Sequence, residues 1–185
     1  MSASEHLQPT VPRSSRAPLA SVDSQAFIAA MTGAVTSVHV LVTDGPAGRF
    51  GITVSAVASV SADPPMVLAC VNRRSPAAAA IRVNGVFSVN LLADHQSHVS
   101  DVFAGRAGGR PAFDFDCAQW HDGPTGCKLL TGAVASFDCV VDSACDAGSH
   151  VVVIGRVVHA HGAEHTPLAH HRRIYCTALP IPARA

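Results

Sequence analysis

Three short runs of the sequence carry residue types suited to binding or catalysis. The first is Asn72-Arg73-Arg74-Ser75-Pro76, which joins an apolar run to a predicted helix. Free backbone N–H groups and the positive end of a helix dipole attract phosphate, and Ser75 with Arg74 or Arg73 adds side-chain donors. Pro76 removes one N–H from the set. Taken alone, these residues are better explained as an ordinary capped helix with two solvated arginines.

The second run covers residues 53–61, Thr-Val-Ser-Ala-Val-Ala-Ser-Val-Ser. Successive side chains of a strand point to opposite faces, so the odd-numbered positions should share one face. Four of these five side chains carry hydroxyls, whereas the even-numbered side chains are all Val or Ala. We expect one face to lie in a core and the other to offer small polar groups to a flat heteroaromatic ring. A solvated outer face is an equally good interpretation.

The third run is Gly148-Ser149-His150, a turn that leads into a predicted strand. A single histidine at a strand end is more often structural than catalytic. Further along, His159 and His161 would share one strand face within a histidine-rich stretch. No HExxH or Cys/His spacing completes a zinc set, so we expect no metal site. The alternative is a metal-binding protein that uses these histidines, and stoichiometric zinc or iron in the purified protein, without flavin affinity, would favour it.

Composition narrows the class of protein. The 185 residues are 48% hydrophobic and 14% charged, which suits one globular domain with part of its surface covered by a second subunit. A formal net charge of zero gives no broad attraction to nucleic acid or to an anionic membrane. No apolar run approaches the roughly 18 residues of a membrane span. The six cysteines form no CxxC pair, which favours reduced thiols in a cytoplasmic protein.

Turn and capping residues divide the chain into short elements, mostly strands. Residues 1–20 are predicted to be a disordered tail, and residues 21–185 one domain. Ser75 as N-cap, Pro76 at the first helical position and Asn84-Gly85 as the stop predict one helix. The other predicted helices cover 23–31 and 96–103, a loop-rich excursion covers 106–131, and the strands cover 35–43, 50–60, 66–71, 86–92, 133–141, 150–161 and 174–179.

In this order and spacing, the segments resemble the flavin reductase domain of two-component monooxygenases, such as those acting on chlorophenol and 4-hydroxyphenylacetate. The resemblance covers about Phe27 to Tyr175. One departure is Gly148-Ser149-His150, where many relatives carry Gly-Asp-His or Gly-Thr-His. The matching runs are residues 51–65 (GITVSAVASVSADPP), 71–75 (VNRRS), 84–92 (NGVFSVNLL), 103–105 (FAG), 148–150 (GSH) and 172–175 (RRIY).

The resemblance implies a mainly β Greek-key split barrel with a few short helices, which forms a homodimer. It implies hydride transfer from NADH to FAD or FMN, after which the reduced flavin leaves for a separate flavin-dependent oxygenase. A flavin-binding carrier or sensor without reductase turnover is the alternative, and NADH would fail to bleach such a protein.

The resemblance also assigns roles to individual residues. We expect His150 to help hold the hydride donor rather than to serve as an obligatory proton donor. The flavin ring and ribityl chain would lie against Thr53, Val54, Ser55, Ala56 and Val57, with Ser59 and Ser61 nearby. The phosphates would be held by Asn72, Arg74 and Ser75, the far end of the flavin by Phe103, Ala104 and Gly105, and the nicotinamide by His150, Arg173 and Tyr175.

Overall fold

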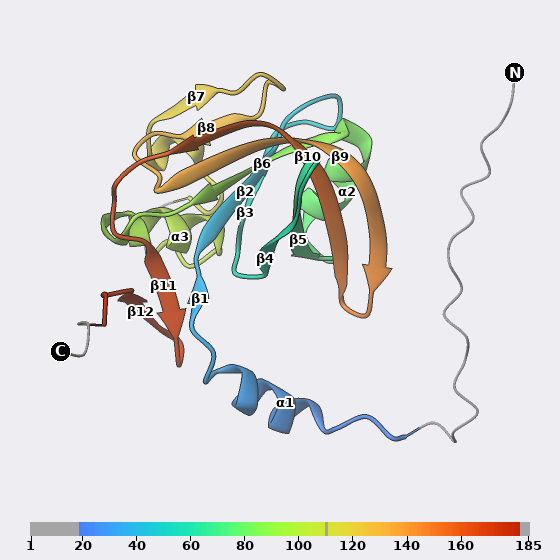
Figure 1. Ribbon diagram of the computed structural model, residues 1–185, viewed down its shortest axis with the longest axis vertical. Coiled ribbons are helices and arrows are strands. Elements are labelled where there is room, and N and C mark those ends of the chain that lie inside the picture. The colour runs from blue at the N-terminus through green and yellow to red at the C-terminus, as the bar shows by residue number, and fades with distance from the viewer. Residues whose placement is uncertain (1–18, 110, 182–185) are drawn as a thin grey trace, which may run out of the picture.

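A seven-stranded antiparallel sheet forms the body of the protein (Figure 1). The computed structural model describes residues 19–109 and 111–181, so most of the predicted N-terminal tail lies outside the described residues. The strand order is β3-β2-β6-β9-β10-β5-β4. These strands are β2 (His39–Thr43), β3 (Phe50–Val54), β4 (Val57–Ala62), β5 (Pro65–Asn72), β6 (Val86–Leu91), β9 (Ala135–Ala147) and β10 (His150–Gly162).

The chain connectivity shows that this sheet is curled into a barrel. β3 and β4 are the two edge strands, yet only Ser55 and Ala56 connect them. Two residues span at most about 11 Å from the end of one strand to the start of the next, so the opposite edges of the sheet must meet there. The edges are not paired with each other, and the barrel is therefore split. This confirms the predicted mainly β split-barrel fold.

Strand β2 lies between two hydrophobic cores, which explains why all five of its residues are buried. Leu41 faces the barrel interior, where it packs with Phe87, Val89 and the inward side chains of β5 and β10. Val40 and Val42 face outward, against residues of α3 (Ser97–Phe103) and β8 (Lys128–Leu130). A strand covered on both faces has no solvent-facing side, so apolar residues follow one another at Val40, Leu41 and Val42 instead of alternating with polar ones.

Helix α2 (Pro76–Asn84) fills the barrel interior through Ala78 and Ile81. Its ends were predicted correctly. The Ser75 side chain accepts a hydrogen bond from Ala77 N, and Gly85 ends the helix with a positive φ of 70°, a conformation that favours glycine.

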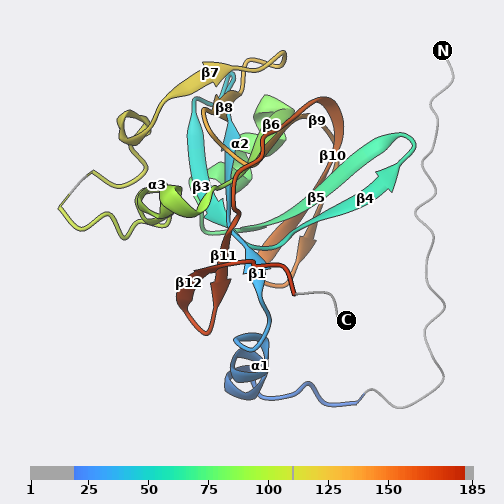
Figure 2. The same ribbon diagram turned by 60° about the vertical axis from the view of Figure 1, so that its left-hand side comes forward.

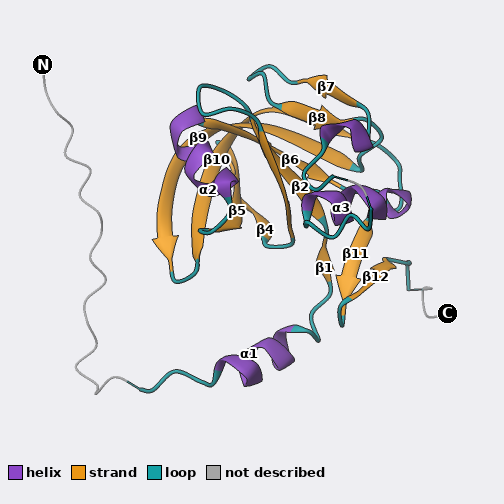
Figure 3. Cartoon of the chain, turned by 180° about the vertical axis from the view of Figure 1, so that it is seen from behind, coloured by secondary structure: helices purple, strands orange, loops and turns teal. Residues whose placement is uncertain are grey.

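Three smaller groups of elements lie outside the barrel: helix α1, the helices and the β7–β8 hairpin between β6 and β9, and a small sheet of β1, β11 and β12. Helix α1 (Ser24–Met31) is capped by Asp23 but buries none of its residues, and it stands apart from the barrel (Figures 2 and 3). The predicted excursion at 106–131 contains a short hairpin, and the last sheet contains a strand, β11, that we did not predict. The elements are α3 (Ser97–Phe103), η1 (Asp94–Gln96), η2 (Phe115–Cys117), β7 (Trp120–Asp122), β8 (Lys128–Leu130), β1 (Thr36–Ser37), β11 (Leu168–His171) and β12 (Ile174–Thr177).

The prediction of one continuous strand over residues 50–60 was wrong. The strand stops at Val54 and restarts at Val57, and a bulge between Ser59 and Ser61 shifts the register again. A break of two residues with irregular backbone destroys the simple alternation of faces. Val57 therefore packs against the barrel core, whereas Ala56 is exposed, so residues 53–61 present no single hydroxyl-bearing face.

Within the described part of the chain, no helix has both the length and the apolar character needed to cross a membrane.

His39 is a buried titratable group at the end of the barrel. Its side chain is 5% exposed, and its Nδ1 atom has no hydrogen-bond partner. Burial lowers the pKa of His39 from 6.5 to about 4, although backbone groups of Val54 and Ser37 partly oppose this shift. The imidazole is therefore neutral in the folded protein at pH 7, and protonation favours the unfolded chain.

We expect the His39 contribution to stability to be complete above pH 6.5, to fall as the pH drops from 6.5 to about 4, and to level off below that. The loss can reach about 3 kcal/mol. In urea unfolding at fixed protein concentration, a His39→Leu variant should lose less stability than the parent between pH 7 and pH 4.5. The exposed His159→Leu is the matched control, and equal acid sensitivity of both variants would contradict the prediction.

Candidate functional site

One pocket lies at the end of β3, where the barrel edges meet. It has a volume of about 170 Å³, and its walls come from β3, from the end of α3 and from the C-terminal hairpin β11–β12. Thr53 is anchored there because its hydroxyl donates to the carbonyl of Ser100 at 2.7 Å. Three segments far apart in sequence therefore meet at this pocket. The predicted residues that line it are Thr53, Val54, Ser55, Ala104 and Tyr175.

A polar network fixes the position of Tyr175 in this pocket. Its hydroxyl donates to Asp101 Oδ1 at 2.7 Å, lies 2.9 Å from Ser100 Oγ and accepts from Arg106 Nη2 at 3.1 Å. Burial, together with the hydrogen bond to Asp101, raises the pKa of Tyr175 above its usual 10. The phenol therefore remains a neutral, oriented group at physiological pH.

The sequence analysis missed Ser100, Asp101, Arg106 and His170, although all four contribute to this pocket or to its neighbour around Tyr175. Their only sequence signal is proximity to the matched runs 103–105 and 172–175. His170 lies on β11, and its ring makes an edge contact with the Tyr175 ring at 5.8 Å between centroids. Because strand β11 was not predicted, the position of His170 beside the pocket could not be predicted either.

The predicted phosphate-binding run forms a tight loop before α2. Asn72 Oδ1 accepts from Arg74 N at 2.9 Å, and Ser75 Oγ accepts from Ala77 N at 3.3 Å. Arg73 is held by the neighbouring hairpin, because its guanidinium donates to Gly148 O and forms an ion pair with Asp146 at 3.6 Å. Arg74 is exposed, and the Ser75 hydroxyl still has its proton to donate.

The Gly148-Ser149-His150 turn lies directly beside this loop. His150 pairs with Asn72 across β5 and β10, and Arg73 N donates to Ser149 O at 3.0 Å. The half-buried His150 ring has its Nδ1 atom 2.9 Å from Ser149 Oγ. Antiparallel pairing of two long strands therefore brings the third candidate run next to the first.

His150 and Tyr175 lie apart within one chain, because the β9–β10 hairpin tip and β12 lie on opposite sides of the β3–β4 connection (Figure 1). The structure corrects the expected role of Phe103. The Phe103 ring is 0% exposed and packs against Phe115 and Trp120, with 4.9 Å and 5.7 Å between ring centroids. Phe103 therefore supports the pocket wall and cannot offer its ring to a ligand.

The other predicted residues occupy less defined positions. Ala56 and Ser59 are exposed, Gly105 follows α3 with a positive φ of 71°, and Ser61 accepts from Asp63 N in a local turn. Val57 belongs to the core. Among residues 19–109 and 111–181, no group of three His, Cys, Asp or Glu side chains could hold a metal ion.

Arg172 and Arg173 form the turn between β11 and β12 in a strained conformation. Their φ angles are 50° and 66°, in the left-handed region that a two-residue type I′ hairpin turn requires. Asn and Gly are the usual residues in such turns, because bulkier side chains are strained there. Arg173 nevertheless lines a cavity with Asp101, Arg106 and Tyr175. Strain of this kind concentrates at functional sites.

The curled sheet, with pockets where its edges meet, places the chain in the split-barrel class. The chain also matches the flavin reductase like domain family over residues 31–179. It therefore belongs to the flavin reductase-like family, and the resemblance inferred from its motifs is confirmed.

Individual relatives agree with this assignment. The chain is 40% identical over 158 residues to the FMN reductase (NADH) RutF of Ancylobacter novellus, with 85% of each chain covered. It resembles BorF, the flavin reductase component of a bacterial two-component tryptophan halogenase, with a TM-score of 0.75, 30% identity, and coverage of 88% of this chain and 100% of that chain. It also resembles the styrene monooxygenase flavin reductase of Pseudomonas putida S12, with a TM-score of 0.72 and 28% identity, over 85% of this chain and 99% of that chain.

We expect Arg172→Gly to raise the free energy of unfolding by up to about 1 kcal/mol, because glycine adopts the left-handed conformation without strain. Arg156→Gly is the matched control. Arg156 is also exposed but lies in β10, where glycine should destabilise by about 0.5–1 kcal/mol. Urea unfolding of both variants measures the difference, and a loss of stability in Arg172→Gly equal to that of the control would show that the turn is not strained.

Proposed function

We propose that this protein is an NADH-dependent flavin reductase that accepts FMN or FAD and releases the reduced flavin. The observation that carries the proposal is the arrangement of pockets along β3. The pocket at Thr53–Ser55 lies at one end of this strand, and Ser75 lies beside Arg49, Phe50 and Gly51 at the other. A flavin has its ring at one end and its phosphate at the other, and it fits along such a strand.

The residues present fit the two ends of a flavin. At the ring end, the Ser55 hydroxyl and nearby backbone groups offer hydrogen bonds to ring carbonyl and nitrogen atoms. At the phosphate end, the Ser75 hydroxyl, the exposed Arg74 and the start of α2 provide donors. The pocket of about 170 Å³ is smaller than the roughly 300 Å³ typical of small-molecule sites, so a second body is needed to enclose the ring.

We infer that this second body is another copy of the chain. Along β5 and β10, the side chains that alternate with the core form an outward apolar surface that the described residues leave partly exposed. Val152 pairs with Cys70 and Ile154 pairs with Leu68, and all four are only half-buried. Helix α1, which buries none of its own residues, would gain a partner in the same way. Sedimentation of the protein as a monomer would contradict this inference.

In the reaction, a bound flavin would supply the hydride-accepting ring, and the protein has to align the two rings and exclude water. Thr53 is held by Ser100, which keeps the β3 end of the pocket rigid. Tyr175 is held in position by its network, stays neutral because burial raises its pKa, and provides a fixed polar edge. His150 stands beside the phosphate loop and would bind part of the nicotinamide donor. Because His150 and Tyr175 are apart in one chain, a dimer could bring them to the same donor.

A flavin-dependent oxygenase is the proposed recipient of the reduced flavin. Support comes from the two structural relatives, which are reductase components of a two-component halogenase and of styrene monooxygenase. If NADH failed to bleach the flavin-bound protein, the chain would be a carrier or sensor instead.

The role of Ser75 is testable with flavins that do and do not carry phosphate. We expect Ser75→Asp to retain stability, because aspartate is as good an N-cap as serine, and to raise the KM for FMN at least tenfold by repelling its phosphate. The KM for riboflavin, which has no phosphate, should stay unchanged. Steady-state NADH oxidation measures both constants.

Ser75→Ala provides the matched comparison, since it removes the cap and destabilises α2 by about 1 kcal/mol without adding charge. Its KM for FMN should rise less than that of Ser75→Asp. If Ser75→Asp left the KM for FMN unchanged, the phosphate site would not lie at this helix.

For His150, we expect substitution by alanine to weaken NADH binding and slow flavin reduction while leaving flavin affinity unchanged. The reason is that His150 lies beside the phosphate loop and does not line the Thr53–Ser55 pocket. Stopped-flow reduction with varied NADH measures the effect. His161→Ala, an exposed histidine on the same strand, is the control. Unchanged NADH affinity and rate in His150→Ala would remove this residue from the site.

A further inference from the structure

A second cavity lies beyond Ser75, at the opposite end of β3 from the Thr53–Ser55 pocket. It has a volume of about 290 Å³ and is walled by the first residues of β3, the first turn of α2 and two phenylalanines, Phe113 and Phe115. Phe50, at this end, is separated from Thr53 by about 10 Å of strand. The volume is close to the lower limit of small-molecule sites, and suits a nucleoside rather than a whole dinucleotide.

Phe113 is an unusual residue in this cavity. Its ring is 52% exposed, and its φ of 60° lies in the left-handed region that bulky residues avoid. Its N–H donates to Val102 O at 3.0 Å, so the backbone is held against the end of α3. A core residue can offset backbone strain by burying its ring, but Phe113 does not. The conformation instead presents an apolar aromatic face at the cavity, which is where a ligand would gain from it.

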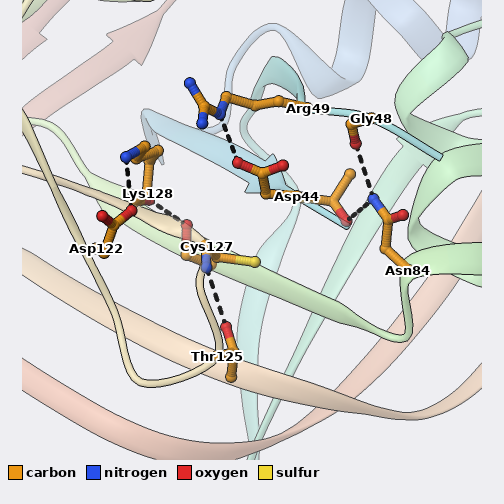
Figure 4. Close-up of polar contacts among 10 residues, drawn as sticks. Asp44, Gly48, Arg49, Asn84, Asp122, Thr125, Cys127 and Lys128 are labelled. Atoms are coloured by element: carbon orange, nitrogen blue, oxygen red, sulfur yellow. Dashed lines mark hydrogen bonds and ion pairs between the residues drawn. The ribbon is translucent and has the colours of Figure 1, made fainter. Parts of the chain in front are cut away.

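The opposite wall carries a fixed positive charge. Arg49 Nε donates to Asp44 Oδ2 at 2.5 Å, and its guanidinium lies over the Phe115 ring, 5.5 Å from the centroid. Figure 4 shows this ion pair beside the turn at Gly48, whose carbonyl accepts from the Asn84 side chain at 3.0 Å. The Arg49 side chain is thus held by its partners rather than free in solvent. Phe113 therefore offers an exposed ring on one wall, and the stacked pair of Arg49 and Phe115 forms the other. Aromatic rings and guanidinium groups are the groups that stack on purine bases.

We propose that this cavity binds the adenosine moiety of FAD, with Phe113 as the stacking residue. The proposal rests on the proposed function, which places the flavin ring at Thr53–Ser55 and the first phosphate at Ser75. What FAD carries beyond that phosphate, and FMN lacks, is the second phosphate and adenosine. The cavity that adjoins Ser75 on the side away from the ring is therefore the one that only FAD can fill. Phe113 sets a preference for FAD, while FMN binds without using the cavity.

The test measures the dissociation constants of FAD and FMN by quenching of flavin fluorescence, together with the KM for NADH with FMN as acceptor. We expect Phe113→Ala to weaken FAD binding at least fivefold, in line with loss of one base-stacking contact, and to leave FMN binding and the KM for NADH unchanged. Phe113→Trp keeps an aromatic face and should keep the preference for FAD. Val83→Ala, an exposed apolar residue at the other end of α2, is the matched control and should change none of the three values.

Several outcomes would overturn the proposal. Equal weakening of FAD and FMN in Phe113→Ala would show that the ring contacts a part that both flavins share. A higher KM for NADH with unchanged FAD binding would assign the cavity to the adenine of NADH. Unchanged FAD binding in Phe113→Ala would remove Phe113 from the site. Since binding is measured without turnover, a parent protein that prefers FAD but oxidises no NADH would contradict the proposed function and support the adenosine site.

Discussion

The two-residue connection at Ser55 and Ala56 constrains the rest of the molecule, because it joins the opposite edges of one sheet. A flat seven-stranded sheet would hold its edges tens of ångströms apart, given a spacing of about 4.8 Å between strands. The sheet therefore has to curl, and curling creates an interior that α2 fills with small side chains and Ile81. The same connection leaves irregular, accessible backbone next to the pocket at the end of β3.

Barrel closure also explains how distant runs of the sequence meet. Pairing of β5 with β10 places His150 across from Asn72, so the hairpin tip and the loop before α2 form one surface. Pairing of β11 with β1 and β12 brings Tyr175 to the end of α3, where its hydroxyl contacts Asp101. The pairings of β5 with β10 and of β1 with β11 join segments far apart in the sequence, Asn72 with His150 and Thr36 with His170, whereas β11 and β12 form a local hairpin. The surface toward a ligand is thus a consequence of strand pairing rather than of any local motif.

The residues with strained backbone line cavities of the protein. Arg172, Arg173 and Phe113 are the non-glycine residues with positive φ in the described part of the chain. Phe113 lines the cavity beside Ser75 and Arg173 the cavity around Tyr175, whereas Arg172 lines a cavity against α1. Elsewhere, positive φ angles are taken by glycines such as Gly48 and Gly85. Selection for stability alone would place glycine or asparagine at such positions. Their occupation by large side chains is consistent with a role for those side chains in binding.

Local signals in the sequence were enough to predict what depends on near neighbours. The cap at Ser75 and the stop at Gly85 were correct, because capping is a contact within one turn of helix. The long strands and the family were also evident, since apolar runs and ordered motifs are properties of the chain itself. Tertiary structure alone decided the break at Ser55–Ala56, the short strand β11 and the burial of Phe103. A strand of four residues is stable only when paired, and the direction of a side chain after an irregular link depends on what closes against it.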